Sequence, residues 1–163
     1  MKPSVKHISL CGIFTAIIFV FTAYLHIPSH NGYIHVGDAA IFLAACLLPT
    51  PYALFAAAVG ASLADLLSGF ALWAPATAII KGLTVLCFAR RDRIINPRNL
   101  LALIPSALLC IGGYYLYESL LTQNFLVAIP GMLGSLMQIL LSGALFAVLG
   151  LALDNINLRR NLR

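Results

Sequence analysis

Six apolar runs, separated by polar or proline-containing segments, form the dominant pattern of the chain. An α-helix rises 1.5 Å per residue, so about 20 apolar residues cross the hydrocarbon core of a bilayer. The pattern therefore predicts an all-α integral membrane protein, a single domain over residues 1–163 with six transmembrane helices. We expect these helices at Ile8–Leu25, Val36–Leu48, Tyr52–Leu67, Ala76–Ala89, Leu100–Leu121 and Pro130–Leu153.

The segment His26–His35, between the first two predicted helices, is polar. It contains Pro28 and Gly32, which favour turns, so we expect an irregular loop. Histidines in this loop could hold a metal, but no acidic or thiol partner stands among them at a ligand spacing. The sequence therefore predicts no metal site and no cofactor. The second helix is short for a full crossing, which suits a membrane domain in which loops bury some helix ends.

Basic residues are concentrated in three places, and their distribution predicts the topology. Cytoplasmic loops and tails of membrane proteins are enriched in Lys and Arg, so we expect both termini on the cytoplasmic side of a prokaryotic cell membrane. The composition is 61% hydrophobic and 9% charged, against about 25% charged residues in soluble domains. The net charge of +5 therefore reports topology, and we expect no nucleic-acid partner. The clustered residues are Lys2, Lys6, Arg90, Arg91, Arg93, Arg98, Arg159, Arg160 and Arg163.

Signatures of catalysis and of nucleotide binding do not occur in the chain. It contains no GxxxxGK[ST] phosphate loop, no HExxH zinc motif and no GxSxG nucleophile motif. The sequence therefore predicts neither ATP binding through a P-loop nor an intramembrane enzyme.

Three ionisable residues, Asp38, Asp65 and Lys81, lie within or at the ends of the apolar runs. A charge at membrane depth is costly and marks a structural pair or a substrate path. Asp65 and Lys81 lie on neighbouring antiparallel helices, so we expect a structural ion pair between them. Asp38 stands at the start of its helix, where it could instead cap the first turn.

Further polar side chains gather toward the outer ends of the predicted helices. Tyr114 and Glu118 share one helix face, Asn124 follows that helix, and Gln138 lies about two turns into the last one. The inner half is almost purely apolar, which predicts a pocket open to the outside rather than a pore. A ring beside a carboxylate would suit a planar polar ligand. The alternatives are an interfacial aromatic belt and, for Gln138, a bond to another helix.

Gly12 and Ala16 form a small-xxx-small pair on the first predicted helix. Small residues at this spacing let another helix approach closely. The spacing fits a helix of the same chain and a helix of a partner protein equally well.

The central block GYIHVGDAAIFLAACLLPTPYALFAAAVGASLADLLSGFALWAPATAIIKGL resembles the substrate-binding S components of energy-coupling factor (ECF) vitamin transporters. The resemblance rests on its Gly-Tyr-Ile-His-x-Gly-Asp, Ala-Asp-Leu-Leu-Ser-Gly and Ala-Pro-Ala-Thr-x-Ile-Ile-Lys-Gly segments. It extends over the whole chain through the six short helices and the basic tail.

The resemblance implies high-affinity vitamin capture by a subunit without enzymatic activity. It implies two kinds of protein partner, a transmembrane coupling (T) protein and two cytoplasmic ATPases that hydrolyse ATP. Gly12 and Ala16 stand where family members carry the small motif that docks on the coupling protein, with Gly in place of the first Ala. The substrate-binding residues that the resemblance implies are His35, Trp73, Tyr114, Glu118, Asn124, Ser135 and Gln138.

The central block is most similar to members assigned to small pyrimidine or pyridine vitamins. We therefore expect hydroxymethylpyrimidine or pyridoxine as the substrate, with riboflavin or another B vitamin as the alternative. A structural membrane subunit without a ligand is the alternative outside transport.

Overall fold

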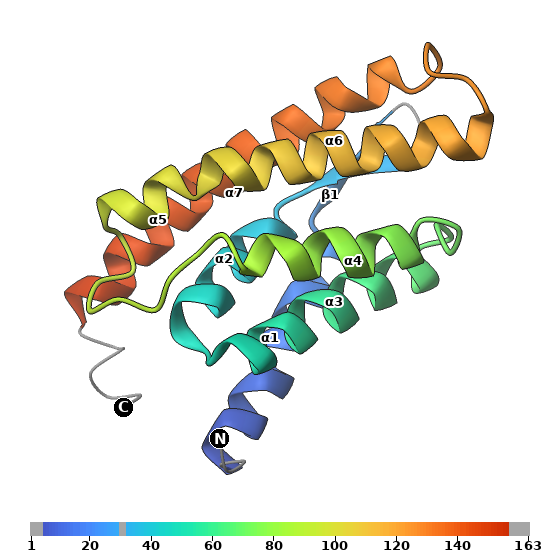
Figure 1. Ribbon diagram of the computed structural model, residues 1–163. Coiled ribbons are helices and arrows are strands. Elements are labelled where there is room, and N and C mark those ends of the chain that lie inside the picture. The colour runs from blue at the N-terminus through green and yellow to red at the C-terminus, as the bar shows by residue number, and fades with distance from the viewer. Residues whose placement is uncertain (1–4, 30–31, 157–163) are drawn as a thin grey trace.

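The computed structural model describes residues 5–29 and 32–156. Seven helices and one hairpin follow one another in this part of the chain (Figure 1). They are α1 (Val5–Ala23), β1 (His26–Ser29), β2 (Gly32–His35), α2 (Gly37–Leu47), α3 (Thr50–Leu67), α4 (Ala74–Val85), α5 (Pro97–Leu101), α6 (Leu103–Thr122) and α7 (Ile129–Asn155).

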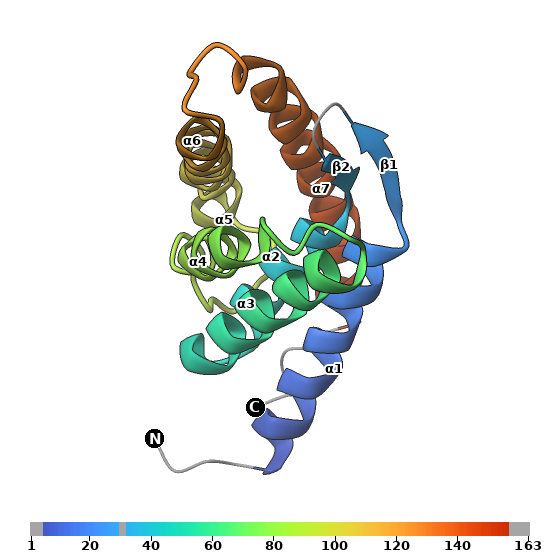
Figure 2. The same ribbon diagram turned by 90° about the vertical axis from the view of Figure 1, so that its right-hand side faces the viewer.

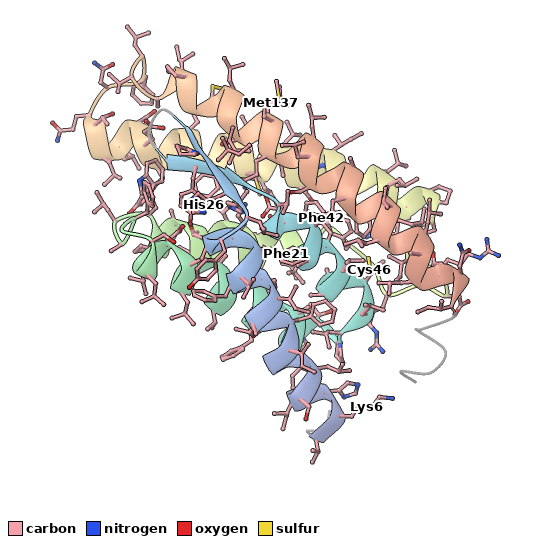
Figure 3. The ribbon with its side chains drawn as sticks, turned by 180° about the vertical axis from the view of Figure 1, so that it is seen from behind. Lys6, Phe21, His26, Phe42, Cys46 and Met137 are labelled. Carbon is pink, nitrogen blue, oxygen red and sulfur yellow. The ribbon has the colours of Figure 1, made fainter. Side chains whose placement is uncertain are left out.

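The short helix α2 is the centre of the molecule, and all eleven of its residues are buried. It packs against α1, α3, α4 and α7, and Figure 2 shows it between α3 and α7. Phe42 of α2 stacks on Phe88, with ring centroids 4.8 Å apart, and meets Phe146 of α7 edge-on at 5.8 Å. In Figure 3, Phe42 and Cys46 lie one turn apart along this helix, whereas Met137 lies on the outward face of α7. Because α2 contacts α1, α3 and α4 on one side and α7 on the other, a side chain on α2 can bond to both groups of helices.

Small residues allow α1 and α3 to pack closely. Ala53, Ala57, Gly60 and Ala61 are all buried on α3. A Cβ atom added to Gly60 would lie 2.7 Å from the backbone oxygen of Thr15, closer than such atoms can approach. Close helix contact through small residues is the common solution in membranes, where no hydrophobic effect drives helices together.

The loop prediction for His26–His35 is wrong, because β1 and β2 form an antiparallel hairpin. His26 pairs with His35, Ile27 with Ile34, and Pro28 with Tyr33. The ladder satisfies backbone groups that would otherwise be unpaired beside the membrane, and a two-stranded sheet tolerates Pro28 because both strands are edges. Figure 3 shows the hairpin leaving the end of α1 near His26 and running beside α7.

Each of the six predicted apolar runs corresponds to a helical segment of the structure, but the ends of these segments differ from the predicted ends. The run predicted at Leu100–Leu121 begins earlier, as α5, and is interrupted at Ala102 before α6. The fourth helix ends at Val85 rather than Ala89. Within the described ranges, four stretches are long and apolar enough to cross a membrane: Val5–Ala23, Thr50–Leu67, Pro97–Thr122 and Ile129–Asn155. The other two, α2 and α4, are shorter apolar helices.

Candidate functional site

A cavity lies where the hairpin, α3, α4, α6 and α7 meet. Its volume is about 100 Å³, whereas roughly 10–15 Å³ by the same measure holds one water molecule. Polar groups and aromatic rings share its wall, as is usual for small-molecule sites. It is lined by Tyr33, Ile34, His35, Asp65, Phe70, Trp73, Thr77, Tyr114, Glu118, Gly131, Gly134, Ser135 and Gln138.

Asp65, near the end of α3, is 6% exposed and lines the cavity. The Tyr33 hydroxyl of β2 donates a hydrogen bond to its Oδ1 at 2.6 Å. Its second oxygen, Oδ2, is buried and has no hydrogen-bond partner in the described part of the chain. Burial, and then the Asp65 carboxylate, raise the pKa of Tyr33 above its usual range, so this hydroxyl stays protonated and donates.

The predicted ion pair between Asp65 and Lys81 is wrong, because Lys81 pairs with Asp38. Lys81 Nζ lies 2.7 Å from Oδ1 and 2.9 Å from Oδ2 of Asp38, and both side chains are fully buried. The physical reason is the position of α2, which brings the carboxylate of its first turn against α4. Asp38 does not cap α2, since Val36 occupies the N-cap position and no side chain caps there.

Gln138 of α7 belongs both to the cavity wall and to this buried network. Its Nε2 donates a hydrogen bond to Oδ2 of Asp38 at 2.8 Å, and the residue lines the cavity. A carboxylate that is paired with lysine only accepts hydrogen bonds, so this contact fixes which end of the amide is the nitrogen. Gln138 therefore bonds another helix, one of its two predicted alternatives, and it also lines the cavity, where its predicted contact with a ligand stays a prediction.

Tyr114 lies between the cavity and the ion pair. Its hydroxyl is 3.0 Å from Oγ1 of Thr77, and Lys81 Nζ lies 5.2 Å from the centre of its ring. That distance is within the range of a cation–π contact. The Trp73 ring lies 6.1 Å from the Tyr114 ring, so two aromatic faces border one side of the cavity.

His35 ends β2 and faces the cavity from the hairpin. Its Nδ1 accepts a hydrogen bond from the backbone N–H of Gly37 at 3.1 Å. Burial lowers the pKa of His35 to about 4, so the imidazole is neutral at pH 7. A neutral ring that accepts at Nδ1 carries its proton on Nε2.

Six of the seven side chains predicted to bind substrate line this one cavity, namely His35, Trp73, Tyr114, Glu118, Ser135 and Gln138. Glu118 is buried there rather than exposed in an interfacial belt. Asn124 is not part of the wall. It is exposed in the turn after α6, where its Oδ1 accepts the backbone N–H of Leu126 at 2.9 Å.

Seven of the thirteen wall residues are missing from the predicted substrate-binding set, and Asp65 among them was expected only as half of an ion pair. The seven are Tyr33, Ile34, Asp65, Phe70, Thr77, Gly131 and Gly134. Tyr33 was assigned to an irregular loop, and Phe70 belongs to the turn between α3 and α4. Thr77 carried a usable signal, because it precedes Lys81 by four residues and so shares its helix face. No group of three or more His, Cys, Asp or Glu side chains that could hold a metal occurs among the described residues.

Gly12 and Ala16 lie apart from the cavity on an exposed face of α1. A Cβ atom added to Gly12 would meet no atom of the described residues within 4 Å. The packing of α1 on α3 uses other positions, such as Ile18 beside Gly60. The alternative that Gly12 packs against a helix of the same chain is therefore wrong.

Comparison with known proteins supplies the family. The sequence model of a family described as "ECF-type riboflavin transporter, S component" matches residues 2–155, nearly the whole chain. None of the curated proteins matches it. S components are subunits of membrane transporters and are not a class of enzymes, and the apolar helices agree with a membrane subunit. The chain therefore belongs to the family of ECF-type riboflavin transporter S components.

Proposed function

We propose that the protein captures a small water-soluble vitamin or vitamin precursor in this cavity, as the substrate-binding subunit of an ATP-driven ECF importer. The cavity is the observation that carries the proposal. It joins buried polar groups to aromatic faces, and it lies at one end of the helices rather than across the whole bundle. That arrangement suits capture from one side of the membrane better than a through-pore.

The proposed topology has six membrane crossings with both termini in the cytoplasm of a prokaryotic cell. The distribution of charge supports it. Lys6 lies at the end of α1 away from the hairpin (Figure 3), and the arginines between α4 and α5 follow the C-terminal end of α4, whereas the cavity is lined by the hairpin and the start of α4. Cytoplasmic placement of these residues puts the cavity on the outer side. The short helices α2 and α4 then cross with their ends covered by neighbouring segments.

The proposed substrate is hydroxymethylpyrimidine or pyridoxine, and the alternative is riboflavin, the vitamin in the name of the family. The size of the cavity supports a single substituted ring, because about 100 Å³ accommodates roughly seven to ten water-sized groups. The aromatic rings of Trp73 and Tyr114 provide faces on which a flat ring can stack.

The proposed protein partners are a transmembrane coupling protein and two cytoplasmic ATPases. The exposed pair Gly12 and Ala16 supports docking of a helix from the coupling protein, since small residues allow close approach. A ligand-free structural subunit is the competing function. The buried carboxylates in the cavity wall count against it, because such groups are costly in a membrane unless they serve a site.

Native mass spectrometry of the purified full chain tests this function, together with titration against a panel of B vitamins and their precursors. We expect one single-ring vitamin to bind with submicromolar affinity. Ser135→Phe, which fills the cavity from α7, should abolish binding. Met137→Phe, at a position 52% exposed on the same helix, should leave it unchanged. Folded protein that carries no small molecule and ignores the whole panel would contradict the proposal.

A further inference from the structure

The cavity wall contains acidic side chains and neither Lys nor Arg. Two carboxylates, Asp65 and Glu118, line it, and none of its lining residues is Lys or Arg. The imidazole of His35 adds no charge, because burial holds its pKa at about 4. The cation nearest to the wall, Lys81, is fully buried and joined to Asp38. Asp65 therefore faces the cavity with no Lys or Arg among the other lining residues.

Asp65 provides the clearest sign of a missing partner. It is 94% buried, since 6% of it is exposed, and the only donor that bonds it in the described residues is the Tyr33 hydroxyl at Oδ1. Oδ2 has no hydrogen-bond partner there. The Thr77 hydroxyl also lies near this carboxylate and is 3.0 Å from the Tyr114 hydroxyl, a contact in which either group can donate, but it forms no hydrogen bond to Oδ2. A buried carboxylate oxygen without a donor is unfavourable, and a bound donor would relieve it.

Of the polar groups nearest to Asp65, Gln138 and Tyr33 have their donors already in use, whereas the wall also holds donors at His35 Nε2 and the Trp73 indole. The nitrogen of the Gln138 amide is used by Asp38, so the carbonyl oxygen is the end available to the cavity. The Tyr33 hydroxyl gives its proton to Asp65. A ligand that offers hydrogen-bond donors to Asp65 would complement this carboxylate, whereas a ligand that offers only carbonyl or carboxylate oxygens there would not.

We propose that the cavity selects its ligand through a donor-rich, protonatable nitrogen edge that binds Asp65. The chemical class is a single heteroaromatic ring bearing an amino group or an ammonium, with its face against Trp73 and Tyr114. A ring that carries a carboxylate or phosphate at that edge is rejected, because like charges repel strongly in a desolvated site. Hydrogen bonds from cationic nitrogen to carboxylate are shorter and stronger than neutral ones. This inference rests on the proposed function and narrows its substrate class.

Two matched ligand series test the inference on the unchanged protein. The first series is pyridoxamine, pyridoxine and 4-pyridoxate, which share a ring and carry an ammonium, a hydroxyl and a carboxylate. The second is 4-amino-5-hydroxymethyl-2-methylpyrimidine and its 4-oxo analogue. In at least one series we expect the amino compound to bind about tenfold or more tightly than the oxygen-bearing ones. Equal or tighter binding of the carboxylate or oxo compounds would overturn the inference, yet it would still support vitamin capture.

The variant Asp65→Asn tests the residue, since it keeps the shape and removes the charge. We expect it to weaken binding of the amino compound about tenfold or more and to abolish the preference over the oxo analogue. Asp92→Asn, which removes an exposed carboxylate beyond the cytoplasmic end of α4, should change neither quantity. Riboflavin binding that is equal in wild type and Asp65→Asn, without any preference for amino compounds, would overturn the inference alone. Folded protein that binds none of these probes would overturn the proposed function as well.

Discussion

His35 stands at the junction of the hairpin and α2, and its protonation state is set by its surroundings. Desolvation is the largest influence and lowers its pKa to about 4. The carboxylate of Asp38 opposes this effect, while Lys81 and His26 reinforce it. The neutral ring accepts the N–H of Gly37, so protonation at Nδ1 would remove a contact that orders the start of α2.

The stability of the protein should therefore fall in mild acid. The folded pKa of His35 is about 4, below the value near 6.5 for an exposed histidine. Between these values the unfolded chain binds the proton and the native chain does not, so stability falls as pH drops from about 6.5 to 4. The loss that this residue contributes is about 3 kcal/mol. Unfolding in detergent at several pH values measures it.

The variant His35→Asn isolates this contribution, because its oxygen can accept the Gly37 N–H and does not titrate. We expect the free energy of unfolding of His35→Asn to depend less steeply on pH across this window than that of the wild type. Identical slopes for the two proteins would show that other groups cause any acid sensitivity.

Individual site residues could be predicted from the sequence as far as their position along a helix determines their depth. Glu118 is near the C-terminal end of α6, and Ser135 and Gln138 are near the N-terminal end of α7. The three side chains line one cavity because these two helix ends are neighbours. The partner of Lys81 could not be predicted in this way. Asp38 and Asp65 lie at similar depth, and the choice between them depends on how deeply α2 inserts between the two halves of the fold.

At the scale of the elements, α2 is a short helix surrounded on all sides, and its one charge lies against α4. A buried pair of this kind adds little net stability, but its separation is costly because a lone charge stays buried. The pair also reaches α7 through Gln138. The pair and Gln138 therefore hold α2, α4 and α7 together beside the cavity.

Single substitutions in this pair should destabilise the protein more than the double substitution does. Lys81→Met leaves the Asp38 carboxylate without a cation and should cost about 3–5 kcal/mol of unfolding free energy. Adding Asp38→Asn should recover much of that loss, whereas adding Asp65→Asn should not. Denaturant unfolding in detergent compares the wild type, Lys81→Met, Asp38→Asn and the two double variants, of which the first three and the Lys81→Met, Asp38→Asn double form one cycle. If Asp65→Asn recovered the lost stability and Asp38→Asn did not, the partner of Lys81 would be Asp65 and not Asp38.

The elements themselves follow from hydropathy, and their exceptions have local causes. Six apolar runs correspond to helical segments. The backbone N–H and C=O groups of a segment buried in the membrane must bond to one another, and a helix achieves this within the segment. Hydropathy did not predict the hairpin, because it cannot distinguish a polar loop from two short strands that pair with each other. It did not predict the break at Ala102 either, because the residues on both sides are equally apolar.

For the whole molecule, the outer surface is largely apolar, with exposed side chains such as Leu120 of α6 and Val148 of α7. Lipid covers such a surface without specificity, so apolar exposure alone does not identify a docking face. The face of α1 around Gly12 and Ala16 differs because it lacks bulk. A backbone can approach there more closely than at a large side chain, and this supports the proposal that a partner helix docks on this face.

Bulk at this face should break assembly and spare ligand capture. In the variant Gly12→Leu with Ala16→Leu, we expect copurification with the coupling protein and ATPases to be lost, because two large side chains separate the packed helices. Vitamin binding by the isolated subunit should stay at the wild-type level, since neither residue lines the cavity. The matched control is Ala144→Leu with Val148→Leu, two exposed positions one turn apart on α7. Retention of the complex by the α1 variant, or its equal loss in the control, would remove Gly12 and Ala16 from the interface and move the search to another helix.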